Sequence, residues 1–566
     1  MLVELNVRPG VYRNGSVREA KGRYYDANLI RWENGKMKPI GGWVKTTTTA
    51  ITGKGRTMMP FRDNAGASYI AVGTSSNLYI YVGKTSTATA VTPSSPIVFN
   101  SGSDVSAVGT GFGSGVFNGD TVLASATYSA TTISAAASDD SFNDSASGFD
   151  TSDYAVGDLI QVSGFTGGGS NNNKTYSNSH RITAITTSKI TCSASTLDDD
   201  AAGEVVTISK AKNFGQDNTA STALVTSANL WSFDMWGEIL IGCCDSDGRI
   251  WYWNPSEVNP LTTEAAIVNT YAPTENTSIL VSKERHLIAF GAGGNPKKIQ
   301  WSTSEDFSTA TSSTNNAWYP QVTNSAGSFE VDTTGKILSA IKVADVILVN
   351  TDVDCHEMRY VGPPYIYSRR KIAGSCGIIS RQTAAAVTGL AAWMSYDGTF
   401  FIYDGSVRAL PCDVAKHITD DINTVQAALF FAEANSLNNE IWWFYVSSAG
   451  SDVDRYVIWN YAENWWSIGQ LERTAFTDIG VFPNPLGIGS DGHIYEHEKR
   501  RVGSSVRGAG VQDPATVTLL SQNDRTLSFG LDPASSNELT FAETGAFEVN
   551  IGERFGHVKT MLTDTI

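Results

Sequence analysis

The sequence predicts an all-β protein, and three observations support this fold class. Aromatic residues make up 10% of the 566 residues, with 14 Trp and 21 Tyr beside 52 Gly, a composition typical of strands joined by tight turns. A hairpin pattern recurs along the chain, and one acidic stretch interrupts it. At about 100–200 residues per domain, we expect two to four domains.

The recurring unit is an apolar strand, a turn bearing Asp-Gly or Asn, and a second strand rich in aromatic residues. It occurs in Ser68–Val82, Trp236–Trp253, Ala391–Tyr403, Asn439–Trp459 and Leu486–Tyr495. Asp-Gly pairs, which supply the positive φ angles of two-residue hairpin turns, begin at Asp247, Asp397, Asp404 and Asp491. Because such hairpins can pack face to face around a ring, the repeat favours a β-propeller body; a run of β-sandwiches is the alternative.

The acidic stretch predicts a separate inserted domain at residues 97–215. Residues 97–210 contain 12 acidic and four basic side chains, so half of the formal net charge of -16 lies there. Apolar and polar residues alternate in Tyr154–Phe165, Arg181–Ile185 and Lys189–Cys192, as they do in strands. We therefore expect a small β-barrel or sandwich, with Gly167–Lys174 as a mobile loop at its tip.

The same hairpin pattern on both sides of the insertion gives the remaining division of the chain. We expect an N-terminal basic arm at 1–50, the first propeller blade or blades at 51–96, the remaining blades at 216–500 and a C-terminal β segment at 501–566, including a strand at FGHVKTMLT. The one convincing helical stretch, Asp413–Thr424, is polar and short, so we expect it to be a connector.

The basic arm is the candidate interface. Residues 1–50 hold nine basic and four acidic side chains, with aromatic residues and glycines among them. This mixture suits an extended segment docked on a surface, and a solvated hairpin is the alternative. The residues that we expect to make the docking contacts are Arg13, Arg23, Tyr25, Arg31, Trp32 and Trp43.

No motif in the sequence predicts catalysis, a metal or a cofactor. His493 and His497, with Glu496 or Glu498, could bind zinc, but the expected strand differs from the helical HExxH site. Four aspartates lack the further ligands of a calcium loop and are interpreted as turn residues: Asp245, Asp247, Asp452 and Asp454. Gly291–Gly294 lacks the lysine and helix of a phosphate site. We therefore expect a protein that is not an enzyme and binds no metal or cofactor.

A glycosidase on a propeller is the enzymatic alternative. Such chemistry requires convergent carboxylates and, for sialic acid, a cluster of arginines. In the Asp-box of sialidases a residue separates Asp from Gly, whereas here Asp directly precedes Gly.

The six cysteines lack CxxC spacing, which predicts free, buried thiols and a reducing compartment. Met1–Gly10 does not read as a signal peptide, and no stretch of about 18 apolar residues occurs. We expect synthesis and folding in the cytoplasm and no membrane span.

Three stretches resemble a known family. Pro9–Trp43 (PGVYRNGSVREAKGRYYDANLIRWENGKMKPIGGW) is similar to the N-terminal signature of tail proteins from short-tailed bacteriophages, and Ser141–Ile185 resembles small β-domains of phage virion proteins. IQWSTSEDF, MRYVGPPYIY, SCGIIS, YDGSVRALPCDV and NEIWWFYV look like the central part of the same family. The resemblance covers most of residues 9–500 and points to tail tube or nozzle proteins similar to tail tubular protein B.

This resemblance implies a structural role in the virion tail, after assembly in the host cytoplasm. The implied partners are further copies of the chain in a six-fold ring, an adaptor protein above it, tail fibre, spike or needle proteins, and double-stranded DNA that passes through without specific binding. The family carries no catalytic residues to transfer. Its members continue with further β structure, whereas this sequence stops at Ile566, so we expect a short member or C-terminal contacts built differently.

Net charge allows two interpretations. A wall of carboxylates repels phosphates over about a Debye length, ~8 Å at physiological salt, so DNA would slide past without binding. Alternatively, the charge only keeps the protein soluble, with the acidic insertion facing outward.

The basic arm can meet an acidic neighbour, which fixes register, or can touch packaged DNA. A hub that carries fibres on the insertion is the second reading of function.

Overall fold

The computed structural model describes residues 7–74, 77–84, 88–93, 105–107, 127–151, 153–174, 180–193, 197–210, 225–245, 248–499 and 541–544. The chain divides into two compact units. The first comprises residues 1–105 and 228–566, and the second comprises residues 106–227. No helix in the described ranges is long and apolar enough to cross a membrane.

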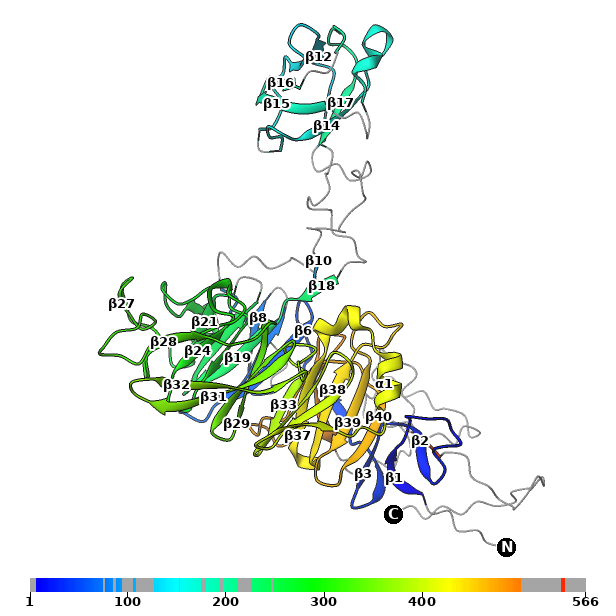
Figure 1. Ribbon diagram of the computed structural model, residues 1–566, viewed down its shortest axis with the longest axis vertical. Helices are drawn as coiled ribbons and strands as arrows, with labels where there is room; N and C mark the ends of the chain where they lie inside the picture. The colour runs from blue at the N-terminus through cyan, green and yellow to red at the C-terminus, as the bar shows by residue number, and fades with distance from the viewer. Residues whose placement is uncertain are drawn as a thin grey trace, which may run out of the picture. The chain divides into compact units, whose positions relative to one another are not determined.

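Seven antiparallel four-stranded sheets form the body of the first unit, and we number them as blades 1–7 (Figure 1). Blades 1–3 contain β6 (Gly55–Arg62), β7 (Ser68–Thr74), β8 (Leu78–Val82) and β9 (Thr89–Ala90); β19 (Trp231–Trp236), β20 (Ile239–Cys244), β21 (Ile250–Trp253) and β22 (Ala266–Ile267); and β23 (Ser278–Val281), β24 (Leu287–Phe290), β25 (Lys298–Trp301) and β28 (Gly327–Glu330).

Blades 4–6 follow in chain order, each with its strands in sequence. They contain β29 (Ile337–Val343), β30 (Val346–Thr351), β31 (Asp354–Gly362) and β32 (Ile366–Gly374); β33 (Ala384–Val387), β34 (Leu390–Met394), β35 (Phe400–Tyr403) and β36 (Val407–Leu410); and β37 (Phe431–Asn435), β38 (Glu440–Tyr445), β39 (Arg455–Asn460) and β40 (Trp465–Gln470). Blade 7 contains β41 (Arg473–Thr477), β42 (Leu486–Gly489), β43 (Ile494–Lys499) and β5 (Gly42–Lys45).

The first strands of the seven sheets form a closed ring. Each contacts the first strand of the next sheet, from β6 through β19, β23, β29, β33 and β37 to β41, which contacts β6 again. These strands therefore surround a central axis, and the remaining strands extend outward. The predicted β-propeller is confirmed, with seven blades in the described residues.

The N-terminal segment closes the ring. β5 pairs antiparallel with β43, so the outer strand of the last blade comes from the start of the chain. Before it lie β1 (Arg8–Val11), which pairs with β2 (Arg23–Asn28), and the hairpin of β3 (Ile30–Glu33) and β4 (Lys36–Pro39). β2 also pairs with β44 (Phe541–Thr544), whereas the predicted strand FGHVKTMLT lies outside the described residues.

Aromatic side chains fill the space between blades, as the strand composition requires. The indole ring of Trp442 in blade 6 stacks on Phe476 of blade 7 at 5.8 Å, and Phe444 lies beside both. Because each such ring buries about 150–250 Å², these contacts supply much of the hydrophobic core.

Local predictions are confirmed. All five expected hairpins contain consecutive antiparallel strands. Glycines at 248, 398, 405 and 492 have positive φ, while Asp247 lies outside the described residues. The expected connector contains the helix α1 (Ala415–Asp421).

Short 3-10 helices are η1 (Gly167–Asn172), η3 (Pro260–Thr262), η4 (Ala292–Gly294), η5 (Thr424–Leu429) and η6 (Ser436–Asn438). A small hairpin pairs β26 (Ala310–Ser312) with β27 (Asn315–Asn316).

The second unit is a single seven-stranded antiparallel sheet around its own apolar core. In sheet order the strands are β11 (Thr127–Ala130), β17 (Val206–Lys210), β14 (Leu159–Ser163), β15 (His180–Thr186), β16 (Lys189–Cys192), β13 (Ser141–Asp144) and β12 (Ile133–Ala136) (Figure 1). The edge strands β11 and β12 are separated by two residues in the chain, so the sheet curls back on itself as a small barrel. In the sequence this unit interrupts the connection from blade 1 to blade 2, which also contains the pair β10 (Val105–Ala107) and β18 (Val225–Ala228).

The stretch Gly167–Lys174, predicted to be a mobile loop, contains a short helix. Its first six residues form η1, and Asn172 is fully buried. The Asn172 side chain donates to the carbonyl of Asp198 at 2.8 Å and accepts from the Asp198 N–H at 2.7 Å. These bonds attach the stretch to the segment that precedes β17.

Candidate functional site

Polar side chains cross the central axis where the innermost strands begin. Gln382, which precedes blade 5, donates to the Thr57 hydroxyl of blade 1 at 2.8 Å and to the Trp231 carbonyl of blade 2 at 3.3 Å. Blade 5 lies on the far side of a seven-blade ring from blades 1 and 2. This end of the axis is therefore bridged by side chains of the propeller itself.

Two ion pairs reinforce this bridged end. Arg381, next to Gln382, pairs with Asp245 in the loop after β20. The Arg56 guanidinium of blade 1 lies 2.7 Å from the Asp452 carboxylate in the β38–β39 loop of blade 6. Both aspartates were predicted to be turn residues, because the sequence does not show which distant arginine each one contacts.

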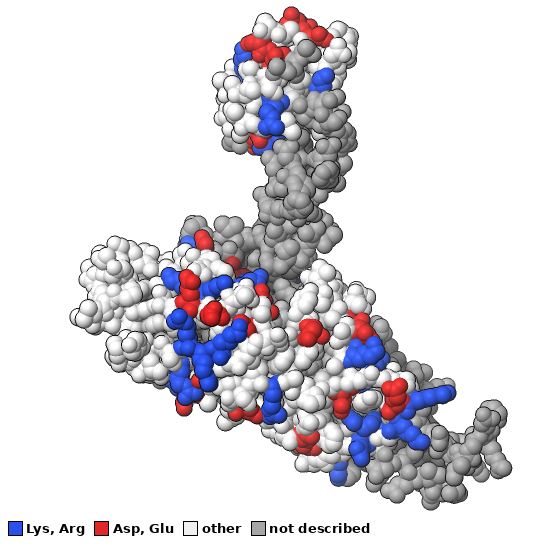
Figure 2. Space-filling model, in the orientation of Figure 1, with Lys and Arg blue, Asp and Glu red and all other residues white. Residues whose placement is uncertain are grey.

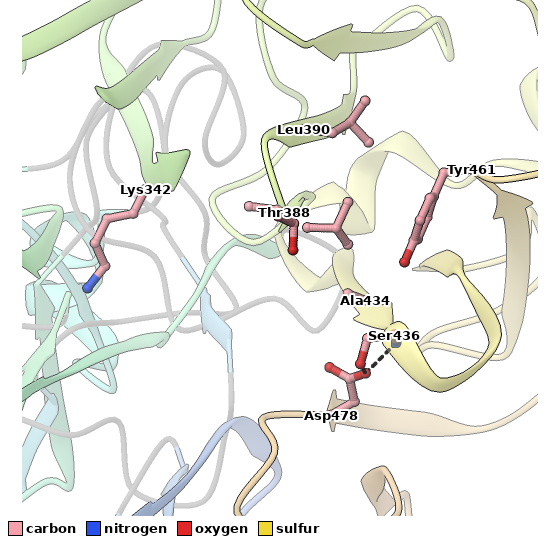
Figure 3. Close-up of a pocket in the computed structure, with 9 residues that line it drawn as sticks. Lys342, Thr388, Leu390, Ala434, Ser436, Tyr461 and Asp478 are labelled. Atoms are coloured by element: carbon pink, nitrogen blue, oxygen red, sulfur yellow. Dashed lines mark hydrogen bonds between the residues drawn. The ribbon is translucent and has the colours of Figure 1, made fainter. Parts of the chain in front are cut away.

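The opposite end of the axis opens into a cavity of about 510 Å³. Its walls come from the ends of the innermost strands and neighbouring turns of blades 4–7 (Figure 3). The residues that line it are Lys342, Ala386, Val387, Thr388, Leu390, Ala434, Ser436, Tyr461 and Asp478. The two ends of the ring thus differ, since one is bridged and the other is hollow.

The charged groups of the cavity already have partners within the chain. The Ser436 hydroxyl donates to Asp478 at 2.6 Å, as Figure 3 shows. Lys342 pairs with Asp234 at 2.7 Å. Burial, together with the Asp478 carboxylate, raises the pKa of the neighbouring Glu433 to about 8. The partner of the Ser436 hydroxyl among the described residues is thus a carboxylate, whereas a serine nucleophile is typically activated by a histidine.

Arg31 of the expected docking arm lies inside its own propeller. Its side chain is 5% exposed and pairs with Glu440 of blade 6 at 2.9 Å and with Glu498 of blade 7 at 2.5 Å. Burial lowers the pKa of Arg31, but the two carboxylates reverse this and raise it above the ordinary value. One cation therefore ties the N-terminal segment to both blades.

Trp32 and Trp43 are also buried in their own subunit. Trp32 packs beside Tyr24 at 5.2 Å, and Trp43 lies over the guanidinium of Arg473 at 5.1 Å. Their exposed fractions are 3% and 5%. Together with Arg31, these residues hold the ring closed and do not form an exposed docking surface. The prediction that Arg31, Trp32 and Trp43 make exposed docking contacts is therefore wrong, since these side chains are covered by their own chain.

The other three candidates lie nearer the surface. Arg13 pairs with Asp26 at 2.8 Å and lies over the Tyr25 ring. Arg23 reaches Asp413 at 2.5 Å. All are partly exposed and remain compatible with a docking role, although the arginines already have partners within the chain.

The suggested zinc ligands serve other purposes. Burial and the charges of Arg473 and Arg31 lower the pKa of His497, whose Nε2 accepts from Arg473 Nε at 3.0 Å. Glu498 pairs with Arg31, and Glu496 pairs with Lys84 at 2.6 Å. In the described ranges, no three His, Cys, Asp or Glu side chains are grouped to hold a metal.

All six cysteines are free, and Cys412 is the one that is not fully buried.

Comparison with known proteins gives no family. No family model matches the chain, and no curated protein matches it. Among solved structures, the computationally designed Ika8 protein is 10% identical, with 81% of this chain and 99% of that chain covered and a TM-score of 0.35. The β-propeller domain of Myceliophteria thermophila Cps50 (Swd1) is 9% identical, with 52% and 87% covered and a TM-score of 0.31. BamB from Moraxella catarrhalis is 15% identical, with 52% and 77% covered and a TM-score of 0.27. Scores this low carry no argument about what this chain does.

Proposed function

We propose that this chain is a structural subunit of a bacteriophage tail. In this proposal, copies of the chain form a ring-shaped nozzle or tube beneath an adaptor protein. The ring retains DNA and conducts it during ejection. The proposal starts from the similarity of Pro9–Trp43 to the N-terminal signature of this tail family. It assigns no catalytic residue, metal or cofactor.

The observation that carries the proposal is the position of the Pro9–Trp43 residues in the fold. Arg31, Trp32 and Trp43 are among these residues, and all three are buried where the N-terminal segment joins blades 6 and 7. Residues at such positions have a physical reason for fixed spacing, since a shift of one residue would turn each side chain to the other face. The signature is therefore a marker of how a propeller is closed, which supports a shared architecture.

The DNA passage in this proposal runs between subunits and not through a single propeller. Side chains of Gln382 and Arg381 already bridge one end of the propeller axis. A closed ring of identical subunits needs head-to-tail interfaces, each burying on the order of 1,200–2,000 Å². Carboxylates along the resulting lumen would let DNA slide by repelling its phosphates.

A tail hub that carries fibres or spikes is the second candidate. The inserted unit favours it, because this unit has its own apolar core of residues such as Phe142, Ile160 and Ile208. A unit that folds around its own core can hold a partner without altering the propeller that carries it.

Electron microscopy of the purified full-length protein, alone and mixed with the adaptor, tests the proposal. We expect rings with a central opening wider than duplex DNA that stack on the adaptor. Particles that stay monomeric at every concentration and do not bind the adaptor would refute the proposed function. So would depolymerisation of a polysaccharide that is lost in Asp478→Asn and Glu433→Gln variants, since that result would indicate a glycosidase.

A further inference from the structure

The outer hairpin of blade 4 is longer than those of the other blades. β31 and β32 have nine residues each, whereas the outermost strands of the other blades have two to six in the described chain. Apolar and aromatic groups are exposed at its tip: Tyr365 is 79%, Val361 is 50% and Tyr360 is 39% exposed. Tyrosines and arginines are enriched in protein interfaces.

Cations cover this hairpin, and the acids that neutralise them lie beneath. Arg359 and Arg370 both pair with Glu357, whose side chain is only 7% exposed, while theirs are 53% and 69% exposed. Lys371 pairs in the same way with the fully buried Asp354. Arg369 lies over the Phe329 ring at 4.9 Å. Lys and Arg accordingly gather over this part of the propeller in Figure 2.

Protection of an edge strand explains only part of this arrangement. Charged side chains on an outermost strand prevent it from pairing with other sheets, and β32 is such a strand. That role does not require the exposed tyrosines and valine at the tip. We call Arg359–Lys371 the basic hairpin, and its composition fits a surface that binds an acidic partner.

A matching acidic surface exists on the inserted unit. Residues 127–210 contain ten acidic and four basic side chains. The turn after β12 and the segment before β17 lie side by side, since the Ala137 N–H donates to Asp199 at 2.7 Å and Ala135 bridges Asp200. The acidic edge that they form consists of Asp139, Asp140, Asp198, Asp199 and Asp200, with Lys189 paired to Asp139.

We propose that the basic hairpin of one copy binds the acidic edge of a neighbouring copy. The contact joins two different surfaces, so it is head-to-tail and can build a closed ring. It rests on the proposed function for the ring and names the surfaces that hold it together. Opposite charges speed association and set register, and the contact weakens as salt rises.

Charge reversal on each surface provides the test. Arg359→Glu with Arg369→Glu makes the basic hairpin acidic while Arg370 still neutralises Glu357. The triple change Asp139→Lys, Asp198→Lys and Asp199→Lys makes the acidic edge basic, because only Asp140 and Asp200 then remain as acids beside Lys189. Controls reverse exposed charges elsewhere: Arg408→Glu with Lys416→Glu, and Asp150→Lys with Asp153→Lys. We expect each test variant to raise the protein concentration needed for assembly by about tenfold or more, and the controls to leave it near the wild-type value.

Mixing the two test variants identifies the contact as one between copies. Each variant alone carries two surfaces of the same charge. In an equimolar mixture, the acidic hairpin of one variant can bind the basic edge of the other. The basic hairpin of the second variant can likewise bind the acidic edge of the first. Sedimentation velocity should show assembly restored in the mixture. Unchanged assembly of both variants, or no rescue on mixing, would overturn the inference while a wild-type ring keeps the proposed function. A hairpin variant that assembles normally but loses binding to duplex DNA would instead identify DNA as the partner.

Discussion

The propeller and the inserted unit differ in how many charged side chains they bury. The propeller buries Arg31, Glu440 and Arg473 between its closing segment and blades 6 and 7. The inserted unit has an apolar core, and nine of its ten acids are exposed or partly exposed, with Asp144 as the buried one. β5 pairs with β43 across more than 440 residues of the chain, whereas the strand pairs in the seven-stranded sheet of the inserted unit join residues at most 82 apart. We infer that buried ionic contacts specify the distant pairing.

Arg31→Ala should produce the largest effect. It leaves the Glu440 and Glu498 carboxylates buried without their cation, which costs about 3–5 kcal/mol of unfolding free energy. Urea denaturation followed by tryptophan fluorescence measures this loss. The matched control is Lys38→Ala, which removes an exposed pair with Glu33 in the same segment. Equal midpoints for the two variants would contradict a closing role for Arg31.

Ile208→Ala should weaken the inserted unit alone. Ile208 is fully buried in the core of that unit, and such truncation costs about 2–5 kcal/mol. Hydrogen exchange should show faster exchange in β14 and β17 with unchanged protection in blades 6 and 7. Equal loss of protection in the propeller would mean that the two units unfold together.

Glu433→Gln should change how propeller stability depends on pH. The folded pKa of about 8 exceeds the ordinary 4.5, so on unfolding above pH 4.5 the carboxyl releases its proton. The stability associated with protonated Glu433 is therefore present below pH 4.5 and is lost as pH rises toward 8. Melting temperatures from pH 4.5 to 8.5 should fall less in the variant than in the wild type. Parallel curves would show that Glu433 titrates normally.

Lys189→Ala should produce the smallest effect. Lys189 and Asp139 are 39% and 44% exposed, and solvent screens pairs of this kind. We expect no measurable shift in the unfolding midpoint of the inserted unit at moderate salt. A loss approaching that of Arg31→Ala would remove the contrast between the two units.

Local features of the fold were predictable from the sequence. The hairpin at Ala391–Tyr403 depends on alternating side chains and on the Asp397-Gly398 turn, and these are close together in the chain. The acidic insertion was visible as a change in composition. The candidate interface was only partly predictable: the segment with Arg31 and Trp43 was recognised, but its burial was not, because basic and aromatic residues also suit an exposed arm.

The sequence by itself determined the strands, their turns and the order of the two units, because these depend on neighbouring residues. Tertiary structure alone decided the number of blades, the burial of Arg31 between Glu440 and Glu498, and the bridge from Gln382 to Thr57. The Arg31 pairs and the Gln382 bond join groups more than 300 residues apart in the chain, and these contacts, like the number of blades, depend on how every intervening blade packs on the next.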